Sequence, residues 1–405
     1  MTKKVNKQLN NVVYKPGKAK ESLTFFVDNS GKNLEDTSTY LKQTEQKALK
    51  QKSNRSKIIN LVCFIISILV LVITLIVQQH TYGVHDITTL EIRQRYLWLT
   101  LLAFFGIMMC DSIRTSVLIH RSTGELRPSL SFKSTVICRY YDCITPFSFG
   151  GQPFQIYYLN SRGVKGGVAS SVPLAKYIYS QVTFCIISTI LLAVGIVNGL
   201  FSNANTQTII SFSIVTLVIC IMFLCGIFFI SLSKKVTPKV VWWLIGVAYK
   251  FKIVKSRELA YANSMRSILE YQRSIKYYMK SFWTTLISFI LSFGIIALKG
   301  LIPYLIYLMF VPNPTVSYFT ILILYNACEL ITMFIPIPGG SGVAELSFTT
   351  LFFAMFPETY IFWAMVFFRV FTYYIYIAQG MLVHIYDIII GNKFNDKYLS
   401  SKNLR

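Results

Sequence analysis

Charged side chains inside apolar stretches are the residues of this sequence best placed to do chemistry. An ionised group in the hydrocarbon of a membrane costs at least ~2.5 kcal/mol, so such groups usually pair, face a cavity or bind a ligand. The basic candidates are Arg139, Lys176 and Arg369, and the acidic candidates are Asp142, Glu329 and Glu345. The basic groups would bind an anion such as a phosphate, and the carboxylates would pair with them or bind a cationic group.

Two alternatives stay open for part of this set. Asp111, Arg114 and Lys176 lie near the ends of their apolar stretches, where long side chains can snorkel to the membrane surface with no further role. Glu329, Glu345 and Arg369 lie deeper, and a structural pair of a glutamate with Arg369 could brace the re-entrant turn instead of binding a ligand.

Two apolar segments are broken by proline and glycine. The first reads Thr-Pro-Phe-Ser-Phe-Gly-Gly-Gln-Pro-Phe over 145–154, and the second reads Ile-Pro-Ile-Pro-Gly-Gly-Ser-Gly-Val-Ala-Glu over 335–345. Each broken segment holds one Gly-Gly pair, and the two segments, one in each half of the chain, should occupy corresponding positions. The turn residues that we assign to the candidate site are Gly150, Gly151, Gln152, Gly339, Gly340 and Gly342.

Such breaks have a physical consequence inside a membrane. Proline removes a backbone donor, glycine permits a sharp turn, and the backbone N–H groups freed in this way cannot face lipid. They must line a protein-buried or watery cavity, and a helix that restarts there favours an anionic ligand. Two interrupted segments in two halves are typical of a transporter's binding site. The alternative is a pair of tight turns between closely packed helices.

The elements that carry these residues are membrane helices. Of 405 residues, 54% are hydrophobic and only 14% are charged, against about 25% in a soluble domain. We therefore predict an all-α polytopic membrane protein with about seven or eight transmembrane helices in two pseudo-symmetric halves, including two re-entrant Gly-Gly segments at 136–160 and 336–356. The predicted spans are 58–77, 97–118, 172–199, 208–232, 281–298 with an extension past Pro303 to 310 left open, 316–335 and 360–388.

Loop charge predicts the orientation. The chain carries 40 Lys and Arg against 17 Asp and Glu, and the basic residues concentrate in the tail 1–57 and in the loop 233–280. Basic loops stay on the cytoplasmic side, so we predict a plasma-membrane protein with both termini cytoplasmic. The transmembrane domain would cover 58–390, followed by a cytoplasmic tail at 391–405. The loop 233–280 is rich in aromatic residues and should form helices in the headgroup layer, or else a protein-docking surface.

Several function classes have no support in the sequence. The basic residues lie between apolar spans, which argues against nucleic acid as a partner. The eight cysteines lie in apolar stretches, with no CxxC and no histidine near the pairs Cys138/Cys143 and Cys220/Cys225, and the four histidines are scattered. We therefore predict no metal site and no cofactor. The sequence has no GxxxxGK[ST] motif, so any driving force should come from an ion or lipid gradient.

The two motifs together resemble those of a known family. The run from Thr145 to Leu159 is similar to the first motif of flippase-like proteins related to the transmembrane region of lysylphosphatidylglycerol synthase. The run from Pro336 to Glu345 resembles the family's second motif, and Arg369 followed by Tyr373 resembles a third element. The resemblance covers about 58–390. The chain departs from the family pattern in one respect: the positive first-motif residue of many relatives is not evident here, and Gln152 occupies the turn.

The resemblance implies a lipid-handling membrane domain. Neither 1–57 nor 233–280 can hold the aminoacyltransferase domain of the full synthase, so we expect a lipid translocase with no enzymatic activity of its own. Its substrate would be a phospholipid or a polyprenyl-phosphate-linked lipid. The alternatives are a phosphatidylglycerol lysyltransferase acting with a separate catalytic partner, and a non-transporting scaffold for lipid synthesis. The expected partners are membrane lipids with anionic headgroups, and both a lipid-synthesis enzyme and a homo-oligomer are compatible with the sequence.

Overall fold

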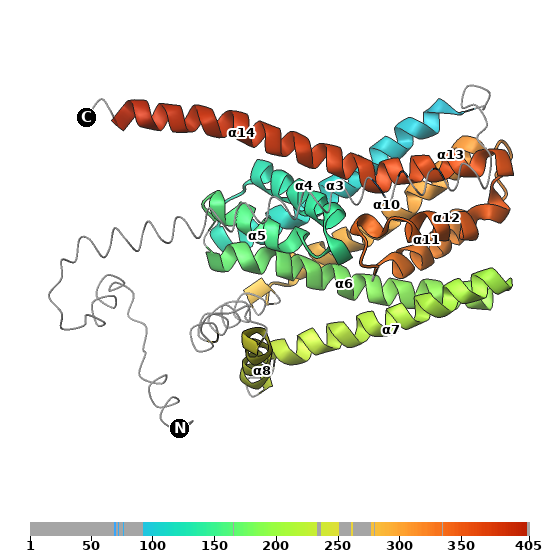
Figure 1. Cartoon of the computed structure of the whole chain (residues 1–405), viewed down its shortest axis with the longest axis horizontal. Coiled ribbons are helices and arrows are strands. Elements are labelled where there is room, and N and C mark those ends of the chain that lie inside the picture. The colour runs from blue at the N-terminus through green and yellow to red at the C-terminus, as the bar shows by residue number, and fades with distance from the viewer. Residues whose placement is uncertain are drawn as a thin grey trace. The chain divides into compact units, whose positions relative to one another are not determined.

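The computed structural model describes residues 92–402 apart from 165, 233–235, 251–260, 262–276, 279 and 334, together with residues 69, 72 and 76 (Figure 1). These residues belong to one compact unit, Ile59–Arg405. The predicted tail 1–57, nearly all of the first span 58–77 and most of the loop 233–280 lie outside the described residues.

Within the described part of the chain, five helical segments are long and apolar enough to cross a membrane. They are α3 (Gln94–Thr123), α6 (Gly166–Val197), α7 (Ala204–Leu232), α10 (Phe282–Phe310), and the run formed by α13 (Glu358–Arg369), the π-helical turn η5 (Val370–Tyr374) and α14 (Ile375–Lys402). Together with the shorter apolar helices, and with no strand among the described residues, they confirm an all-α polytopic membrane protein. The extension past Pro303 is real, because α10 continues to Phe310. The described part of the loop 233–280 includes a helix, α8 (Val236–Lys250).

Two pairs of short helices form hairpins around the proline–glycine breaks. The first hairpin is α4 (Pro128–Ile144), the 3₁₀ turn η2 (Pro146–Ser148) and α5 (Gly151–Ser161); the second is α11 (Tyr318–Thr332), η3 (Pro338–Gly340) and α12 (Val343–Phe352). The predicted span 316–335 is therefore α11, and its 15 residues reach only about 22 Å against ~30 Å of hydrocarbon. It is one arm of a hairpin, and α12, within the segment 336–356, is the return arm.

The two halves repeat at one constant spacing along the chain. Pro146 and Pro338 open the two 3₁₀ turns, Gly151 and Val343 open the second arms, and α6 and α13 begin at 166 and 358. The long helices α3 and α10 precede the two hairpins in the same order. Each half is thus a long helix, a broken hairpin and a second long helix.

The hairpins enter from opposite ends of the bundle. The helices α3 and α10 are antiparallel, because the Arg93 N–H donates to the Met309 carbonyl at 3.3 Å and Ser122 bonds the Tyr278 hydroxyl at 2.5 Å. Tyr318 at the start of α11 packs on Tyr304, and Phe356 after α12 packs on Tyr307, so this hairpin opens at the Met309 end.

The first hairpin opens at the other end. Leu159, near the end of α5, shares a buried cluster with Leu118 and Tyr278, and Leu130 at the start of α4 packs against that cluster. The break η2 contacts η3, and α4 also contacts η3. The two breaks therefore meet in the interior, where Figure 1 shows α4 and α5 approaching from one side and α11 and α12 from the other.

Candidate functional site

A cavity of about 1540 Å³ lies where the two breaks meet. Its wall includes residues of α3, α4, α6, α10 and α11 and of both turns. The predicted site residues that line it are Arg139, Asp142, Gln152, Lys176, Glu329, Gly339, Gly340, Arg369 and Tyr373. Those that do not line it are Gly150, Gly151, Gly342 and Glu345, which shape the turns from behind.

The first break is held by side chains at the end of α4 and at its C-cap, Thr145. The Asp142 carboxylate accepts the Gly151 N–H at 3.0 Å, and the Thr145 hydroxyl accepts the Gly150 N–H at 2.9 Å, so α4 caps the helix that restarts at α5. A Cβ on Gly151 would lie 2.1 Å from the Asp142 Oδ1, which explains the glycine. Phe147 and Ser148 have φ of 57° and 53°, a left-handed conformation that is strained for side chains of this kind.

The second break has glycine at the two positions where non-glycine residues of the first break adopt a strained left-handed backbone. Gly339 and Gly340, with φ of +64° and +60°, take the places in the repeat that Phe147 and Ser148 take in the first half. A Cβ on Gly339 would lie 2.0 Å from the Tyr373 ring, which the π-helical turn brings over the break. The broken segments therefore correspond, but their Gly-Gly pairs do not, and matching one pair to the other is wrong by three positions.

Arg369 is fully engaged by the second break. It forms an ion pair with Glu345 at 2.7 Å and donates to the Gly339 carbonyl at 3.2 Å and to the Ser341 hydroxyl at 2.9 Å. Glu345 in turn accepts the Gly342 N–H at 2.6 Å. With 4% of Arg369 exposed, this arrangement favours the bracing alternative over a phosphate contact.

A second cluster of charges surrounds Asp111 at the first break. Asp111 is fully buried and lies 2.7 Å from Arg114, 2.9 Å from Arg139 and 3.5 Å from Lys176. The cluster joins α3, α4 and α6. The Asp111 carboxylate compensates part of the positive charge of the three cations. Because these groups bond one another, simple snorkelling does not describe Asp111, Arg114 and Lys176.

The three cations of this cluster differ in how many hydrogen-bond partners they have and in how much of the side chain is exposed. Arg114 also donates to Ser180 and Ser292 at 2.6 Å each, and its side chain is only 2% exposed. Lys176 is 6% exposed, and its Nζ has no hydrogen-bond acceptor among the described residues. The Arg139 side chain is 25% exposed. Arg139 and Lys176 are therefore the cations best able to meet a ligand in the cavity.

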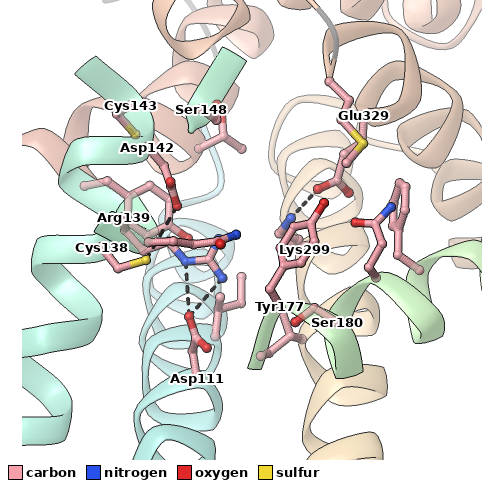
Figure 2. A pocket seen from close by; sticks show the side chains of 18 of the residues that line it. Asp111, Cys138, Arg139, Asp142, Cys143, Ser148, Tyr177, Ser180, Lys299 and Glu329 are labelled. Carbon is pink, nitrogen blue, oxygen red and sulfur yellow. Dashed lines mark hydrogen bonds and ion pairs between the residues drawn. The ribbon is translucent and has the colours of Figure 1, made fainter. Parts of the chain in front are cut away.

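The opposite wall carries a third charged group. Lys299 on α10 forms an ion pair with Glu329 on α11, and their side chains are 25% and 24% exposed (Figure 2). Figure 2 shows this pair facing Asp111, Arg139 and Asp142 across the cavity, with Tyr177 and Ser180 beside it. Among the described residues, no group of His, Cys, Asp and Glu gathers as a metal site would require.

Lys299 was not among the residues predicted from the sequence, and Asp111 and Arg114 were not predicted as members of the candidate site. A lone lysine within the apolar run 281–310 is a signal that could have identified Lys299. Asp111 and Arg114 are an i,i+3 pair of opposite charges in an apolar helix, which could have marked the hub of the cluster.

The fold and the cavity define a polytopic membrane protein with two broken hairpins that face each other across a charged interior. The family model described as "Lysylphosphatidylglycerol synthase TM region" matches residues 63–380, so the chain belongs to this family. No curated protein matched the chain, and no solved structure matched it.

Proposed function

We propose that this protein is a lipid translocase that moves a phospholipid or a polyprenyl-phosphate-linked lipid between the leaflets of the plasma membrane. The observation that carries the proposal is the charged cavity at the meeting point of the two hairpins, with Arg139 and Lys176 on its wall. A lipid crosses a bilayer slowly because its charged headgroup must leave water. A cavity with buried cations at membrane depth lowers that cost.

The repeat supports movement between two sides. Two halves with the same order of elements, and hairpins that open at opposite ends, can expose one central site to either leaflet in turn. The exposed large apolar side chains of α7, including Phe212 at 62% and Met222 at 68%, fit a surface in contact with acyl chains. Both termini would be cytoplasmic, as the loop charges predict.

The transport assay uses the full chain in liposomes that contain a trace of acyl-labelled fluorescent phospholipid. A membrane-impermeant quencher reports how fast inner-leaflet lipid reaches the outer leaflet. The wild type should move lipid much faster than empty liposomes, and the double variant Arg139→Gln/Lys176→Gln should lose at least about tenfold in rate, because each buried charge contact is worth more than a tenfold factor. The variant Arg127→Gln, at an exposed arginine paired with Glu125, is the matched control and should keep the rate. A wild type no faster than empty liposomes rules out the proposal.

The family match favours one second candidate, a lysyltransferase acting with a catalytic partner. Incubation of the isolated chain with lysyl-tRNA and phosphatidylglycerol should give no lysyl-lipid above a blank, since the described residues are a helical membrane domain with no acyltransferase fold. A clear lysyl-lipid product would promote this candidate over the translocase. The scaffold alternative calls for an uncharged, tightly packed centre, and the charged cavity gives it no support.

A further inference from the structure

The charges of the cavity are not evenly balanced. Two of its charged groups are neutral pairs, Lys299 with Glu329 and Arg369 with Glu345. The cluster at the first break holds three cations against two carboxylates, the cations being Arg114, Arg139 and Lys176, and the carboxylates being Asp111 and Asp142. When Glu345, which pairs with Arg369 from behind the wall, is included and all carboxylates are ionised, these described residues carry five cations against four carboxylates. The one excess positive charge belongs to the cluster at the first break.

The two carboxylates of the cluster play different parts. Asp111 is fully buried and contacts all three cations. Asp142 lines the cavity, forms no ion pair with any described residue, and bonds the Gly151 N–H at 3.0 Å and the Cys138 thiol at 3.9 Å. Asp111 therefore holds the cluster together, whereas the Asp142 charge remains uncompensated by a direct partner and is felt by any anion in the cavity.

Lys176 provides the place for that anion. Its ammonium group is almost completely buried, lines the cavity, and has no hydrogen-bond acceptor among the described residues. Its N–H groups can donate to a phosphoryl oxygen beside the more exposed Arg139. An anion held there balances the excess charge when it carries one negative charge.

We infer that Asp142 sets the headgroup charge that this cavity accepts, so that it takes a lipid phosphodiester with one negative charge and rejects phosphomonoester and pyrophosphate lipids. The inference rests on the proposed function and narrows its substrates: phosphodiesters remain, on a phospholipid or on a polyprenol, and phosphatidic acid, free polyprenyl phosphates and polyprenyl pyrophosphates are excluded. A second negative charge on the ligand would exceed the available positive charge and would face the Asp142 carboxylate without a compensating cation. Asp142 is a specificity-determining residue in this account, and it also caps α5.

The test is a displacement assay with the purified full chain and a fluorescent phosphatidylglycerol. Unlabelled phosphatidylglycerol is compared with phosphatidic acid at pH 8, where a phosphomonoester carries nearly two negative charges. The wild type should prefer phosphatidylglycerol at least about tenfold, which corresponds to one charge contact. A wild type that binds the two lipids equally overturns the inference without any variant.

Asp142→Asn removes the charge and keeps an oxygen that can accept the Gly151 N–H. It should reduce the preference for phosphatidylglycerol at least about tenfold, mainly by tighter binding of phosphatidic acid. Asp142→Glu, which keeps the charge, should keep the preference, and Glu125→Gln, which removes an exposed carboxylate elsewhere, should leave it unchanged within about twofold. An Asp142→Asn protein with the wild-type preference contradicts the inference.

The transport assay separates this inference from the proposed function. Selective binding without lipid movement in liposomes rejects the translocase and leaves the assignment of Asp142 standing. Lipid movement that is equally fast for phosphatidylglycerol and phosphatidic acid at pH 8 supports the translocase and rejects the assignment of Asp142.

Discussion

The two breaks have the same backbone plan but different chemistry. In the second hairpin, the Glu345–Arg369 pair and the glycines at 339 and 340 satisfy the turn from within. In the first hairpin, Phe147 and Ser148 hold strained left-handed backbone, and the nearby cluster keeps an excess cation that faces the cavity. The comparison indicates that the second break is mainly a structural brace, whereas the first break is where a ligand is held.

The largest effect should follow from breaking the brace. Arg369→Ala leaves Glu345 buried without its partner, and removal of one member of a buried ion pair costs about 3–5 kcal/mol. We expect a marked loss of unfolding free energy in detergent, measured by denaturant or thermal unfolding. The exposed Arg127→Ala should change stability by less than about 1 kcal/mol.

This result would support the structural ion pair over the phosphate contact, the two roles that the sequence left open for Arg369. If the Arg369→Ala protein kept the wild-type stability and lost only lipid binding, the second break would bind the ligand, and its assignment as a structural brace would be wrong.

The next effect concerns the close approach at the first break. Gly151→Ala places a Cβ 2.1 Å from Asp142 and 2.4 Å from the Cys138 carbonyl, so α5 must shift. We expect about a tenfold loss of transport in liposomes and a stability cost of about 1–3 kcal/mol, with membrane insertion preserved. Gly294→Ala, where no atom lies within 4 Å of the new Cβ, is the control. Normal transport by Gly151→Ala would show that the cap by Asp142 is dispensable.

The opposed entry of the hairpins predicts a pattern of accessibility. In intact cells, single cysteines placed within 201–203 and 312–317 in a cysteine-free background should react with an impermeant reagent, and cysteines within 124–127 should react only after permeabilisation. The reason is that the uncharged loops lie outside and the basic loops inside. Reaction of the cysteines in 124–127 from outside, as well as those in 201–203 and 312–317, would show that the two hairpins do not enter from opposite sides of the membrane.

The smallest effect tests the strain at the first break. Phe147→Gly frees a residue with φ of 57° and should raise the unfolding free energy by about 1 kcal/mol. Phe149→Gly is the matched control because Phe149 has φ of −89° and gains nothing from glycine. Destabilisation by Phe147→Gly that equals or exceeds that of Phe149→Gly would show that the ring contributes more than the strain costs.

The long helices, the two breaks and several charged residues of the cavity could be predicted from the sequence, because each is indicated by residues close together in the chain. Apolar length predicted the long helices, and proline and glycine located both breaks. Their meeting around one cavity follows from the rule that freed backbone groups cannot face lipid. Arg139, Asp142 and Lys176 were identified because charges in apolar sequence are rare.

The remainder depends on contacts between distant segments. The charge cluster at Asp111 joins α3, α4 and α6; the i,i+3 pair with Arg114 is visible in the sequence, but the contacts of Asp111 with Arg139 and Lys176 are not. The length of α11 was overestimated because its apolar composition continues into the break, where Pro336 and Pro338 end the helix. Aligning the two Gly-Gly pairs gives the wrong spacing for the repeat, because identical residue types in the two halves do not occupy corresponding backbone positions.

If Arg139 and Lys176 hold the phosphate of a lipid in the cavity between the two breaks, that lipid should remain bound when the protein is purified in native-membrane discs. Mass spectrometry of the co-purified lipids should show one class of phosphate-bearing lipid enriched over the bulk membrane, with the wild type and with Arg127→Gln. The folded double variant Arg139→Gln/Lys176→Gln should lose the enrichment. Equal enrichment with the double variant and the wild type would show that these two cations do not hold the lipid.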